Sequence, residues 1–399
     1  MAGILDGIRV LDFGRYIAGP YCGALLSDLG AEVIRIEKVN GSEDRYVMPM
    51  TEDGSDDVAG AQFLQMNRNK LGFTLNPMKD EGRKIVRRLV ETADVVIANL
   101  PPATLEAMGL DYPTLCEIKP DIILTTVSAF GRGGPYSDRV GFDGIGQVMS
   151  GAAYLTGNPG QPTKAYTPWV DFGTASLCAF GTMAALFERQ KTGKGQQVEG
   201  ALLATALSFF NFNLIEQSLT HVNRIASGNR SQTSGPADIY KAKDGSLLAW
   251  VVGQPLFERW AHLMGDAETW LNDPRFADDA ARGDNGEILS ARMSDWCAER
   301  TVDEALAALE EARIPAGPVL SPAQVLKDPH VEQVGFLQNV NYPNVPGPAP
   351  VAKTPVQFSE TPAGIKIRAP QLGEHTEQIL KELGYSDDDI GSLRDKRIV

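Results

Sequence analysis

IRVLDFGRYIAGPYCGALLSDLGAEVIRIE, at residues 8–37, places a helix-forming segment between two short apolar runs. The runs Ile8–Phe13 and Ala31–Glu37 have the length and composition of buried strands. The segment from Ala18 to about Leu29 carries a proline in its first turn and is followed by a glycine, as is typical of the two ends of a helix. A strand, a helix and a second strand in so short a stretch predict a parallel pair joined by a right-handed crossover.

The alternation of helices and strands continues along the chain. A one-sided apolar pattern predicts a helix at 76–94, and apolar runs predict strands at 95–98 and 121–127. This alternation favours an α/β domain with a parallel sheet, in which ligands bind beyond the carboxyl ends of the strands. The loops expected at that edge are 14–19, 38–44, 99–103 and 128–136. The first strand is not followed by a G-x-G-x-x-G motif, and the sequence has no P-loop motif, which counts against a dehydrogenase-like or non-catalytic nucleotide binder.

Charge and composition exclude several classes of partner. The 399 residues carry a formal net charge of −14, so neither nucleic acid nor an anionic membrane is an expected partner. We find no N-terminal signal peptide and no run of about 18 apolar residues, and we therefore expect a cytoplasmic protein without a spanning helix. The four cysteines are scattered, so neither a disulfide framework nor a metal site is expected. All four histidines lie at or after His221, which excludes a local Ser-His-Asp arrangement in the first half.

The second half of the chain divides into segments of different character. Residues 222–236 are polar and residues 342–350 are Pro-rich, and we interpret both as linkers. Four of the five tryptophans lie between them, which indicates a compact small domain. The predicted organisation is a large domain at 1–221, a linker at 222–236, a small domain at 237–330, a linker at 331–350 and a return to the large domain at 351–399.

The stretch Ala165–Ala175 contains one carboxylate, Asp171, among small and apolar residues. Long helices are expected after it, at 173–190 and 201–218, and both are apolar on nearly every side, which predicts burial in a core or an interface. Asp171 can serve only as a helix cap. Alternatively, it is a catalytic nucleophile, because a carboxylate can carry a covalent intermediate. In both interpretations the helix N-terminus is expected to hold the carboxylate ionised.

Several blocks of the sequence resemble one known family. The blocks are Gly7–Phe13 with Ala18–Pro20, Leu29–Glu37, Asn67–Lys70, Lys191–Gly195, Ile314–Val319 and Leu372–Thr376. In this order, they resemble the class III (family III) CoA-transferases from about Gly3 to Leu393. The resemblance implies a Rossmann-like large domain with a parallel sheet, built from both chain ends, and an inserted small α+β domain. It also implies a homodimer of two interlocked rings.

The resemblance also implies a reaction. Asp171 matches the family's nucleophile, which accepts the acyl group of an acyl-CoA as an anhydride and then carries CoA as an aspartyl-CoA thioester. The acceptor is a free mono- or dicarboxylic acid, and the sequence identifies neither acid. Coenzyme A is a substrate and product here, and neither a metal nor a further cofactor is implied. The alternative is an acyl-CoA racemase or epimerase of the same fold, but Phe142 stands where that reaction needs a histidine base.

Binding residues are assigned by the same resemblance. Tyr16, Ile17 and Ala18 match the backbone segment that approaches the pantetheine of CoA. Residues that match its adenine and phosphate contacts are Lys38, Asn67, Asn69, Lys70 and Asn99, with Arg139 as a further candidate. Asp143 matches a carboxylate near the active site, and Arg15 and Gln147 are candidate substrate contacts. Simpler interpretations remain open: surface charge for the lysines and Arg139, turn chemistry for the asparagines and Asp143, and packing for Tyr16.

Two stretches depart from the family pattern. Asn99–Ala103 reads Asn-Leu-Pro-Pro-Ala where the family often has Asn-Phe-x-Pro-Gly. The short turn Val251–Pro255 stands where formyl-CoA transferase has a glycine-rich lid. The second departure argues against formyl-CoA and oxalate as the substrate pair.

Overall fold

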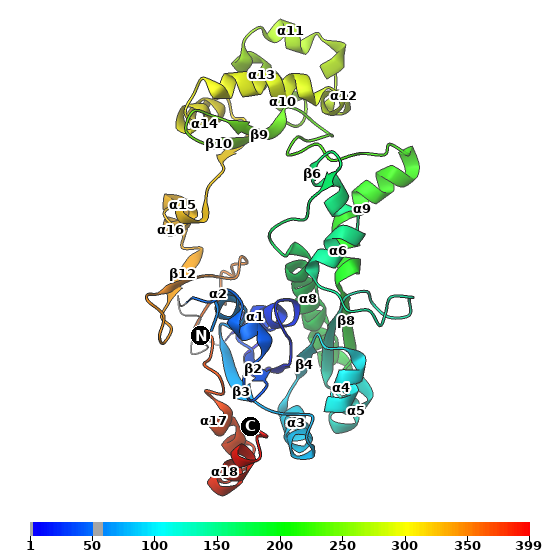
Figure 1. Cartoon of the computed structure of the whole chain (residues 1–399), viewed down its shortest axis with the longest axis vertical. Coiled ribbons are helices and arrows are strands. Elements are labelled where there is room, and N and C mark those ends of the chain that lie inside the picture. The colour runs from blue at the N-terminus through cyan, green and yellow to red at the C-terminus, as the bar shows by residue number, and fades with distance from the viewer. Residues whose placement is uncertain (1–2, 51–58) are drawn as a thin grey trace. The chain divides into compact units, whose positions relative to one another are not determined.

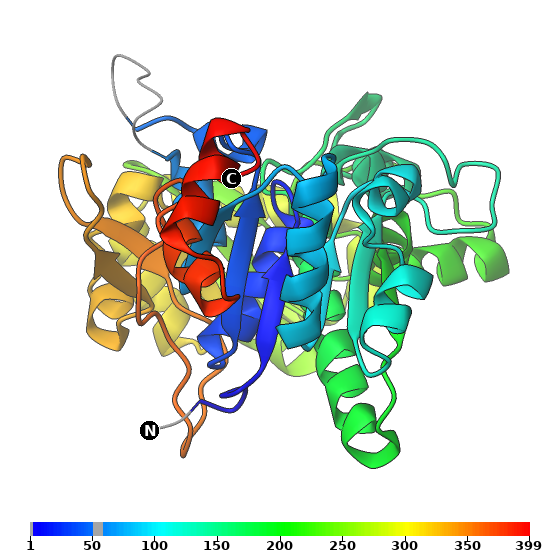
Figure 2. The same ribbon diagram turned by 90° about the horizontal axis from the view of Figure 1, so that it is seen from below.

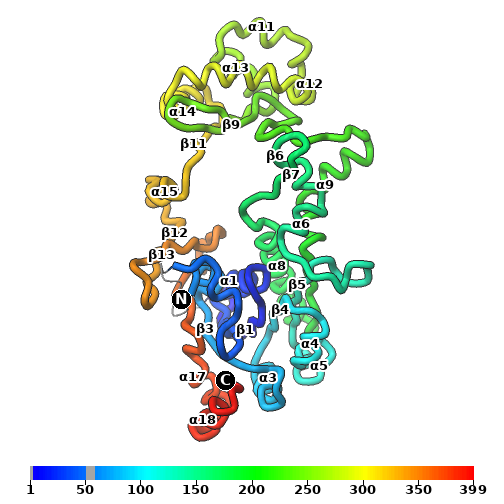
Figure 3. Tube along the Cα trace, viewed as in Figure 1, coloured from blue at the N-terminus to red at the C-terminus, as the bar shows by residue number. Residues whose placement is uncertain are grey.

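The computed structural model describes residues 3–50 and 59–399. Within this part of the chain two compact units are distinguished (Figure 1). Unit 1 comprises Met1–Ser150, Tyr166–Phe212 and Gln333–Val399, and unit 2 comprises Gly151–Ala165 and Asn213–Glu332. Figure 3 follows the backbone out of unit 1 along α9 and back into it at β12.

Unit 1 is built on a parallel sheet of six strands. The strands are β1 (Arg9–Asp12), β2 (Glu32–Glu37), β3 (Lys70–Thr74), β4 (Val95–Ala98), β5 (Ile123–Ser128) and β8 (Gln197–Ala201). Their order is β3-β2-β1-β4-β5-β8, and each adjacent pair runs parallel. This is the strand order of a Rossmann fold, so the predicted Rossmann-like parallel sheet is confirmed. The order reverses between β1 and β4, and the loops after these two strands therefore meet at the edge where such folds bind ligands.

Helices cover both faces of this sheet because successive side chains of each buried strand point to opposite faces. Leu11 packs in a core with α3 (Asp80–Thr92), α4 (Pro102–Met108), α5 (Tyr112–Ile118), α17 (Thr376–Glu382) and α18 (Asp387–Asp395). Its neighbour Val10 packs in a second core with α1 (Ala18–Asp28), α8 (Trp169–Thr192) and α9 (Leu202–Thr220). Figure 2 shows the red C-terminal helices beside the blue N-terminal strands.

The C-terminal segment closes the free edge of the sheet at β3. The backbone N–H of Gly72 donates to Nδ1 of His375 at 3.1 Å, and the N–H of His375 donates to the carbonyl of Gly72 at 2.9 Å. One residue pair along, the N–H of Thr74 donates to the hydroxyl of Thr376 at 2.9 Å. A covered edge does not expose unpaired backbone groups. His375 and Thr376, at the start of α17, therefore cover the edge of the sheet that carries the N-terminal strands.

The remainder of unit 1 consists of short elements. They are η1 (Glu43–Tyr46), α2 (Ala61–Met66), α6 (Asp143–Met149), β12 (Leu337–Val340), β13 (Ala349–Ala352) and the last two residues of α16 (Pro329–Val334). Strands β12 and β13 pair antiparallel and pack with α2 around Phe63.

Unit 2 has its own core around Trp260. Its small sheet has the order β11-β10-β9, with β9 (Ala237–Lys241), β10 (Ser246–Trp250) and β11 (Ala316–Pro318). Its helices and remaining strands are α7 (Ala152–Leu155), β6 (Gly157–Asn158), β7 (Gln161–Pro162), α10 (Gln254–Met264), α11 (Ala267–Leu271), η2 (Pro274–Phe276), α12 (Asp279–Asp284), α13 (Gly286–Ala298), α14 (Val302–Glu311) and α15 (Pro322–Val325). A capping box opens α14, in which the side chains of Thr301 and Glu304 bond reciprocally to the backbone.

The two long apolar helices differ from their prediction in extent and exposure. Helix α8 begins at Trp169 rather than near residue 173, so Asp171 lies inside its first turn. One side of α8 is buried as expected, whereas α9 is buried only near its start, at Leu202, Thr205 and Ala206. Phe180 of α8 and Phe212 of α9 are 73% and 70% exposed in the single chain. By length and composition alone, α8 is one helix in the described residues that could span a bilayer, although we expected none. In unit 1, α8 packs on α1, β5 and β8.

Candidate active site

Asp171 is placed by the start of α8, where it is the third helical residue. Pro168 occupies the N-cap position and supplies no side-chain cap. Helix α8 leads through a short turn into β8, which is parallel to β5. Since a helix that precedes a strand of this sheet starts at the carboxyl edge, Asp171 lies on the edge where ligands bind in such folds.

The missing cap of α8 is supplied by Asp143, the first residue of α6. Its Oδ2 accepts hydrogen bonds from the backbone N–H groups of Val170 at 2.8 Å and of Asp171 at 3.1 Å. Its Oδ1 accepts a hydrogen bond from Nε2 of Gln147, one turn along α6. The structure thus brings together three of the residues selected from the sequence. Asp143 is buried, and it fixes the backbone that carries Asp171.

The electrostatics of Asp171 correct one expectation. Burial, followed by the nearby negative charge of Asp143, raises the pKa of Asp171 to about 7. The free helical N–H groups that were expected to stabilise its anion donate to Asp143 instead. Within the described residues, no hydrogen bond or ion pair stabilises the Asp171 carboxylate. A carboxylate that is desolvated and unpaired is a stronger nucleophile than a hydrated one, once it is ionised.

The loop between β1 and α1 lies beside both carboxylate-bearing helices. The ring of Tyr16 contacts that of Phe142, which precedes Asp143, at a centroid distance of 5.8 Å. The ring of Tyr21, in α1, contacts that of Phe172, which follows Asp171, at 4.9 Å. Ile17 is the N-cap residue of α1, and Ala18 is its first residue. The segment expected to approach pantetheine therefore lies next to the Asp143–Asp171 pair.

The side chains of Asn99 and Arg15 form hydrogen bonds with the backbone of this loop and of its neighbours. The side chain of Asn99 accepts a hydrogen bond from the backbone N–H of Arg15 at 2.7 Å and donates to the carbonyl of Arg15 at 2.9 Å. The guanidinium of Arg15 donates to the carbonyls of Phe13, Gly14 and Ile36. Burial, together with the charge of Arg35, lowers the pKa of Arg15 to about 10. Both side chains are thus engaged with backbone.

Asn67, Asn69 and Lys70 take up a more internal position than an adenine contact suggests. Lys70 is fully buried, and its ammonium donates to Asp12 at 2.7 Å, to the carbonyl of Pro20 at 2.7 Å and to Asn67 at 3.0 Å. Asn67 is buried beside it and donates to the carbonyl of Phe63. Asn69, with a φ of 62°, accepts hydrogen bonds from the N–H groups of Lys366 and Ile367. These contacts hold the sheet to α1 and to the C-terminal segment.

Lys38 and Arg139 are the two selected cations with exposed side chains. Lys38 follows β2 and forms an ion pair with Glu43 across the turn. The guanidinium of Arg139 lies over the ring of Tyr136, 4.1 Å from its centroid. Both are therefore accessible to a phosphate without disruption of the core.

Sequence reasoning did not select Asp12, Arg35 or Tyr21. Asp12 accepts a hydrogen bond from the N–H of Gly14 at 2.8 Å, and Arg35 donates to the carbonyl of Gly14. Both are charged residues inside apolar strand segments, and this was the available signal, because a buried charge requires a partner. Tyr21 had no such signal, since its contact with Phe172 joins residues far apart in the sequence.

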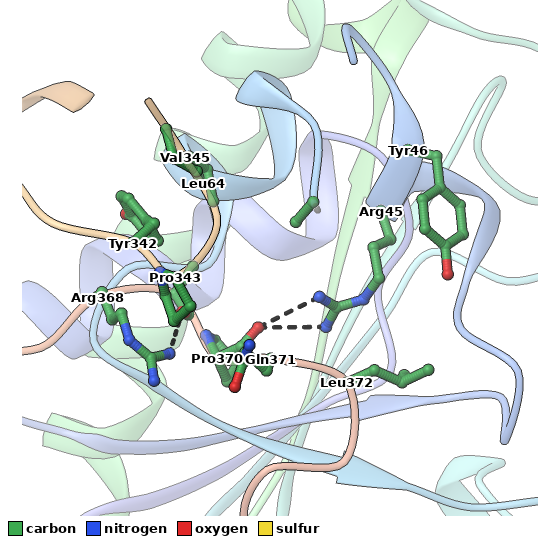
Figure 4. A pocket seen from close by; sticks show the side chains of 12 residues that line it. Arg45, Tyr46, Leu64, Tyr342, Pro343, Val345, Arg368, Pro370, Gln371 and Leu372 are labelled. Atoms are coloured by element: carbon green, nitrogen blue, oxygen red, sulfur yellow. Dashed lines mark hydrogen bonds between the residues drawn. The ribbon is translucent and has the colours of Figure 1, made fainter. Parts of the chain in front are cut away.

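A separate pocket of about 90 Å³ in unit 1 lies between Arg45, Leu64 and the C-terminal segment (Figure 4). Arg45 lines it but pairs with Glu37 at 2.5 Å and donates to the carbonyl of Pro370. Arg368 also lines it and pairs with Glu374 at 2.6 Å. Both positive charges are therefore neutralised within the protein. Neither guanidinium is free to bind an anion in this pocket.

The sequence as a whole matches the family model described as CoA-transferase family III over residues 5–376. This chain belongs to CoA-transferase family III. Among curated members, the succinyl-CoA–D-citramalate CoA-transferase of Chloroflexus aurantiacus is 34% identical over 402 residues, covering 99% of this chain and 98% of that protein. The succinate–glutarate CoA-transferase of Agrobacterium fabrum is 33% identical, covering 95% of each.

A solved structure agrees with the architecture. The CAIB/BAIF family protein from Brucella suis aligns with a TM-score of 0.83 and 32% sequence identity, covering 96% of this chain and 100% of that one. The family III resemblance drawn from the sequence blocks is therefore confirmed, as is the α/β fold with a large parallel sheet. As a family III CoA-transferase, the protein is an enzyme that uses CoA as a substrate.

Proposed function

We propose that this CoA-transferase moves CoA from an acyl-CoA to a free carboxylic acid through covalent intermediates on Asp171. Family membership supports the overall reaction. The placement of Asp171 supports its role: its carboxylate is desolvated and unpaired among the described residues, while its backbone is fixed by Asp143. A helix cap alone would use the Asp171 carboxylate to accept the helical N–H groups, and here Asp143 does so.

In the first half-reaction, the ionised Asp171 attacks the thioester carbonyl carbon of the donor. An oxygen–carbon bond forms, the carbon–sulfur bond breaks, and CoA leaves as a thiolate. The product on the enzyme is a mixed anhydride. The thiolate then attacks the Asp171 carbonyl of this anhydride and releases the donor acid as a carboxylate. Asp171 now carries CoA as an aspartyl thioester.

The second half-reaction runs in the opposite direction with the acceptor. Its carboxylate attacks the aspartyl thioester, which forms a new anhydride and expels the CoA thiolate. The thiolate attacks the acceptor carbonyl carbon, so the new acyl-CoA forms and Asp171 returns as a carboxylate. Nucleophiles and leaving groups are carboxylates or thiolates throughout, so no proton has to move in any step. A site without a histidine base therefore suits this chemistry.

The surrounding residues are assigned from their positions. Asp143 and Gln147 orient the start of α8, and the proposed pantetheine contacts Tyr16, Ile17 and Ala18 lie beside it. Lys38 and Arg139, whose side chains are exposed, are the proposed contacts for the phosphates of CoA. The proposed roles of Asn67, Asn69, Lys70 and Asn99 in CoA binding are indirect, since these side chains hold the backbone of the site. The guanidinium of Arg15 likewise holds backbone, because it donates to the carbonyl of Gly14.

We propose a dicarboxylate pair, with succinyl-CoA as the first donor to test. The curated relatives named above carry succinyl-CoA or succinate, with citramalate or glutarate, in their names. The sequence departure at Val251–Pro255 argues in the same direction, away from formyl-CoA and oxalate.

We further propose a cytoplasmic, interlocked homodimer in which unit 2 is the inserted domain. The exposed aromatic side chains on α8 and α9 support an interface with a second copy, because large apolar faces are seldom left in water. The alternative racemase has no base at the position of Phe142.

Two assays separate the proposals. Transfer of CoA from succinyl-CoA to a panel of dicarboxylates should be lost in Asp171→Ala, and full activity in that variant would refute the role of Asp171. Exchange of the α-proton of an acyl-CoA with deuterated water, without CoA transfer, would instead identify a racemase.

A further inference from the structure

Asn99 grips both polar groups of one backbone residue at the point where the sheet order reverses. It follows β4 directly, and its side chain bonds to the N–H of Arg15 at 2.7 Å and to the carbonyl of Arg15 at 2.9 Å. An amide side chain that uses its donor and its acceptor on the same residue behaves like a strand partner. It therefore fixes the peptide planes before and after Arg15, including the one that leads into Tyr16.

Tyr16, the residue that follows, adopts a strained conformation. Its φ is 61°, in the left-handed region that is strained for a residue with a Cβ atom. This strain persists only where the surrounding contacts overdetermine the backbone, and it is concentrated at functional sites. The strained backbone directs the Tyr16 ring to Phe142, immediately before Asp143.

The loop is also held at Gly14, before Arg15, and at Gly19, in the first turn of α1. Gly14 is bonded at its N–H by Asp12 and at its carbonyl by Arg35. A Cβ atom at Gly19 would lie 2.8 Å from the Cα of Gly14 and 3.3 Å from Oδ1 of Asn99, so the start of α1 is packed directly against the loop. Side chains from β1, β2 and the end of β4 thus leave the backbone at residues 14 and 15 little freedom.

We propose that Asn99 is a positioning residue that holds Tyr16 in its left-handed conformation, and that this strained conformation forms the wall of the acyl-CoA site beside Asp143 and Asp171. The proposal rests on the proposed CoA-transfer function. It replaces a direct phosphate contact for Asn99 by an action through the backbone of Arg15. Without the two hydrogen bonds from Asn99 to the backbone of Arg15, Tyr16 relaxes to a conformation with negative φ. The loop then loses the shape that binds acyl-CoA.

The test combines Asn99→Ala with a matched pair of substitutions at residue 16. Tyr16→Ala and Tyr16→Gly both remove the ring, but only glycine adopts a positive φ without strain. Asn99→Ala is made in the wild-type, Tyr16→Ala and Tyr16→Gly backgrounds. The KM for succinyl-CoA, the kcat and the thermal midpoint are measured for each protein. Asn272→Ala is the control, because it removes an exposed hydrogen bond to Glu268 in unit 2.

We expect Asn99→Ala to raise KM about tenfold in the wild-type and Tyr16→Ala backgrounds, as the loss of two weak hydrogen bonds would produce. In the Tyr16→Gly background, the same substitution should raise KM by no more than about threefold and should lower the thermal midpoint less. Equal effects in the alanine and glycine backgrounds would overturn the proposal, and so would a lowered midpoint with an unchanged KM. If the wild-type protein transfers no CoA, the proposed function fails. The change in thermal midpoint caused by Asn99→Ala, compared between the Tyr16→Ala and Tyr16→Gly backgrounds, still decides whether Asn99 holds residue 16.

Discussion

Oδ2 of Asp143 accepts a hydrogen bond from the backbone N–H of Asp171 at 3.1 Å, and a second from Val170 at 2.8 Å. One carboxylate thus caps the helix that carries the other. The pair is separated by 28 positions in the sequence. The cap positions Asp171, and its negative charge also makes ionisation of Asp171 less favourable.

The first prediction concerns the pH dependence of catalysis. The pKa of Asp171 is raised to about 7 by burial and by Asp143, and only the ionised form attacks a thioester. The kcat/KM for the acyl-CoA should therefore rise with pH below about 7 and level off above it. Asp143→Asn keeps an acceptor for the helical N–H groups but removes the charge. The rise of kcat/KM should therefore occur at lower pH in this variant. If kcat/KM rises over the same pH range in Asp143→Asn, the charge of Asp143 does not raise the pKa of Asp171.

The second prediction concerns stability at the same residue. The native pKa of Asp171 lies above its ordinary value of 3.8, so the native state keeps its proton longer than the unfolded state as pH rises. Asp171 therefore favours folding at low pH, and this contribution is lost as pH rises from about 4 through about 7. Relative to wild type, Asp171→Asn should gain about 2–4 kcal/mol of unfolding free energy between pH 4 and pH 8. Urea unfolding at both pH values measures the gain, and a pH-independent difference would contradict the account.

The third prediction separates the two lysines that the sequence assigned to CoA. Lys70 is buried against Asp12, so Lys70→Met should lower the unfolding free energy by about 3 kcal/mol. Lys38 forms an exposed pair with Glu43, so Lys38→Met should change stability by less than about 0.5 kcal/mol. If Lys38 contacts a phosphate, that variant should instead raise the KM for acyl-CoA. Similar stability losses in the two variants would contradict their placement.

The fourth prediction concerns the closed edge of the sheet. Burial lowers the pKa of His375, whose Nδ1 accepts a hydrogen bond from Gly72 only while it is unprotonated. The unfolded chain therefore binds the proton more readily, and stability should fall as pH drops below about 6.5, the ordinary value. This loss should be smaller in His375→Leu, which has no acceptor at any pH. Denaturant midpoints at pH 8 and pH 5.5 measure the difference, and equal pH sensitivity would exclude His375 as its source.

The fifth prediction concerns assembly. Phe180 and Phe187 lie seven residues apart on α8, on one side of the helix, and both are exposed in the single chain. If this side forms a dimer interface, Phe180→Asp with Phe187→Asp should reduce the mass measured by light scattering from that of a dimer. Val356→Asp, at an exposed apolar residue elsewhere in unit 1, is the control. A monomeric wild-type protein would refute the proposed dimer.

The sequence predicted the sheet better than the site, for physical reasons. Strands such as Val95–Ala98 are continuous apolar runs, and their pattern is local. Strand β3 was missed because it begins with Lys70, a charge that is tolerated only through its contact with Asp12, far away in the sequence. The start of α8 was placed near residue 173 because its cap comes from Asp143, and no residue beside Pro168 signals it. Asp171 was found from its local setting and its family block, whereas its pKa depends on contacts that only the fold supplies.

The most direct test of the central claim is the detection of CoA on Asp171. The protein is incubated with succinyl-CoA without an acceptor, and one sample is treated with hydroxylamine before digestion and mass spectrometry. We predict a CoA adduct on the peptide that contains Asp171, its conversion to a hydroxamate by hydroxylamine, and the absence of both in Asp171→Asn. A modified residue other than Asp171, or CoA transfer at the wild-type rate by Asp171→Asn, would contradict the account.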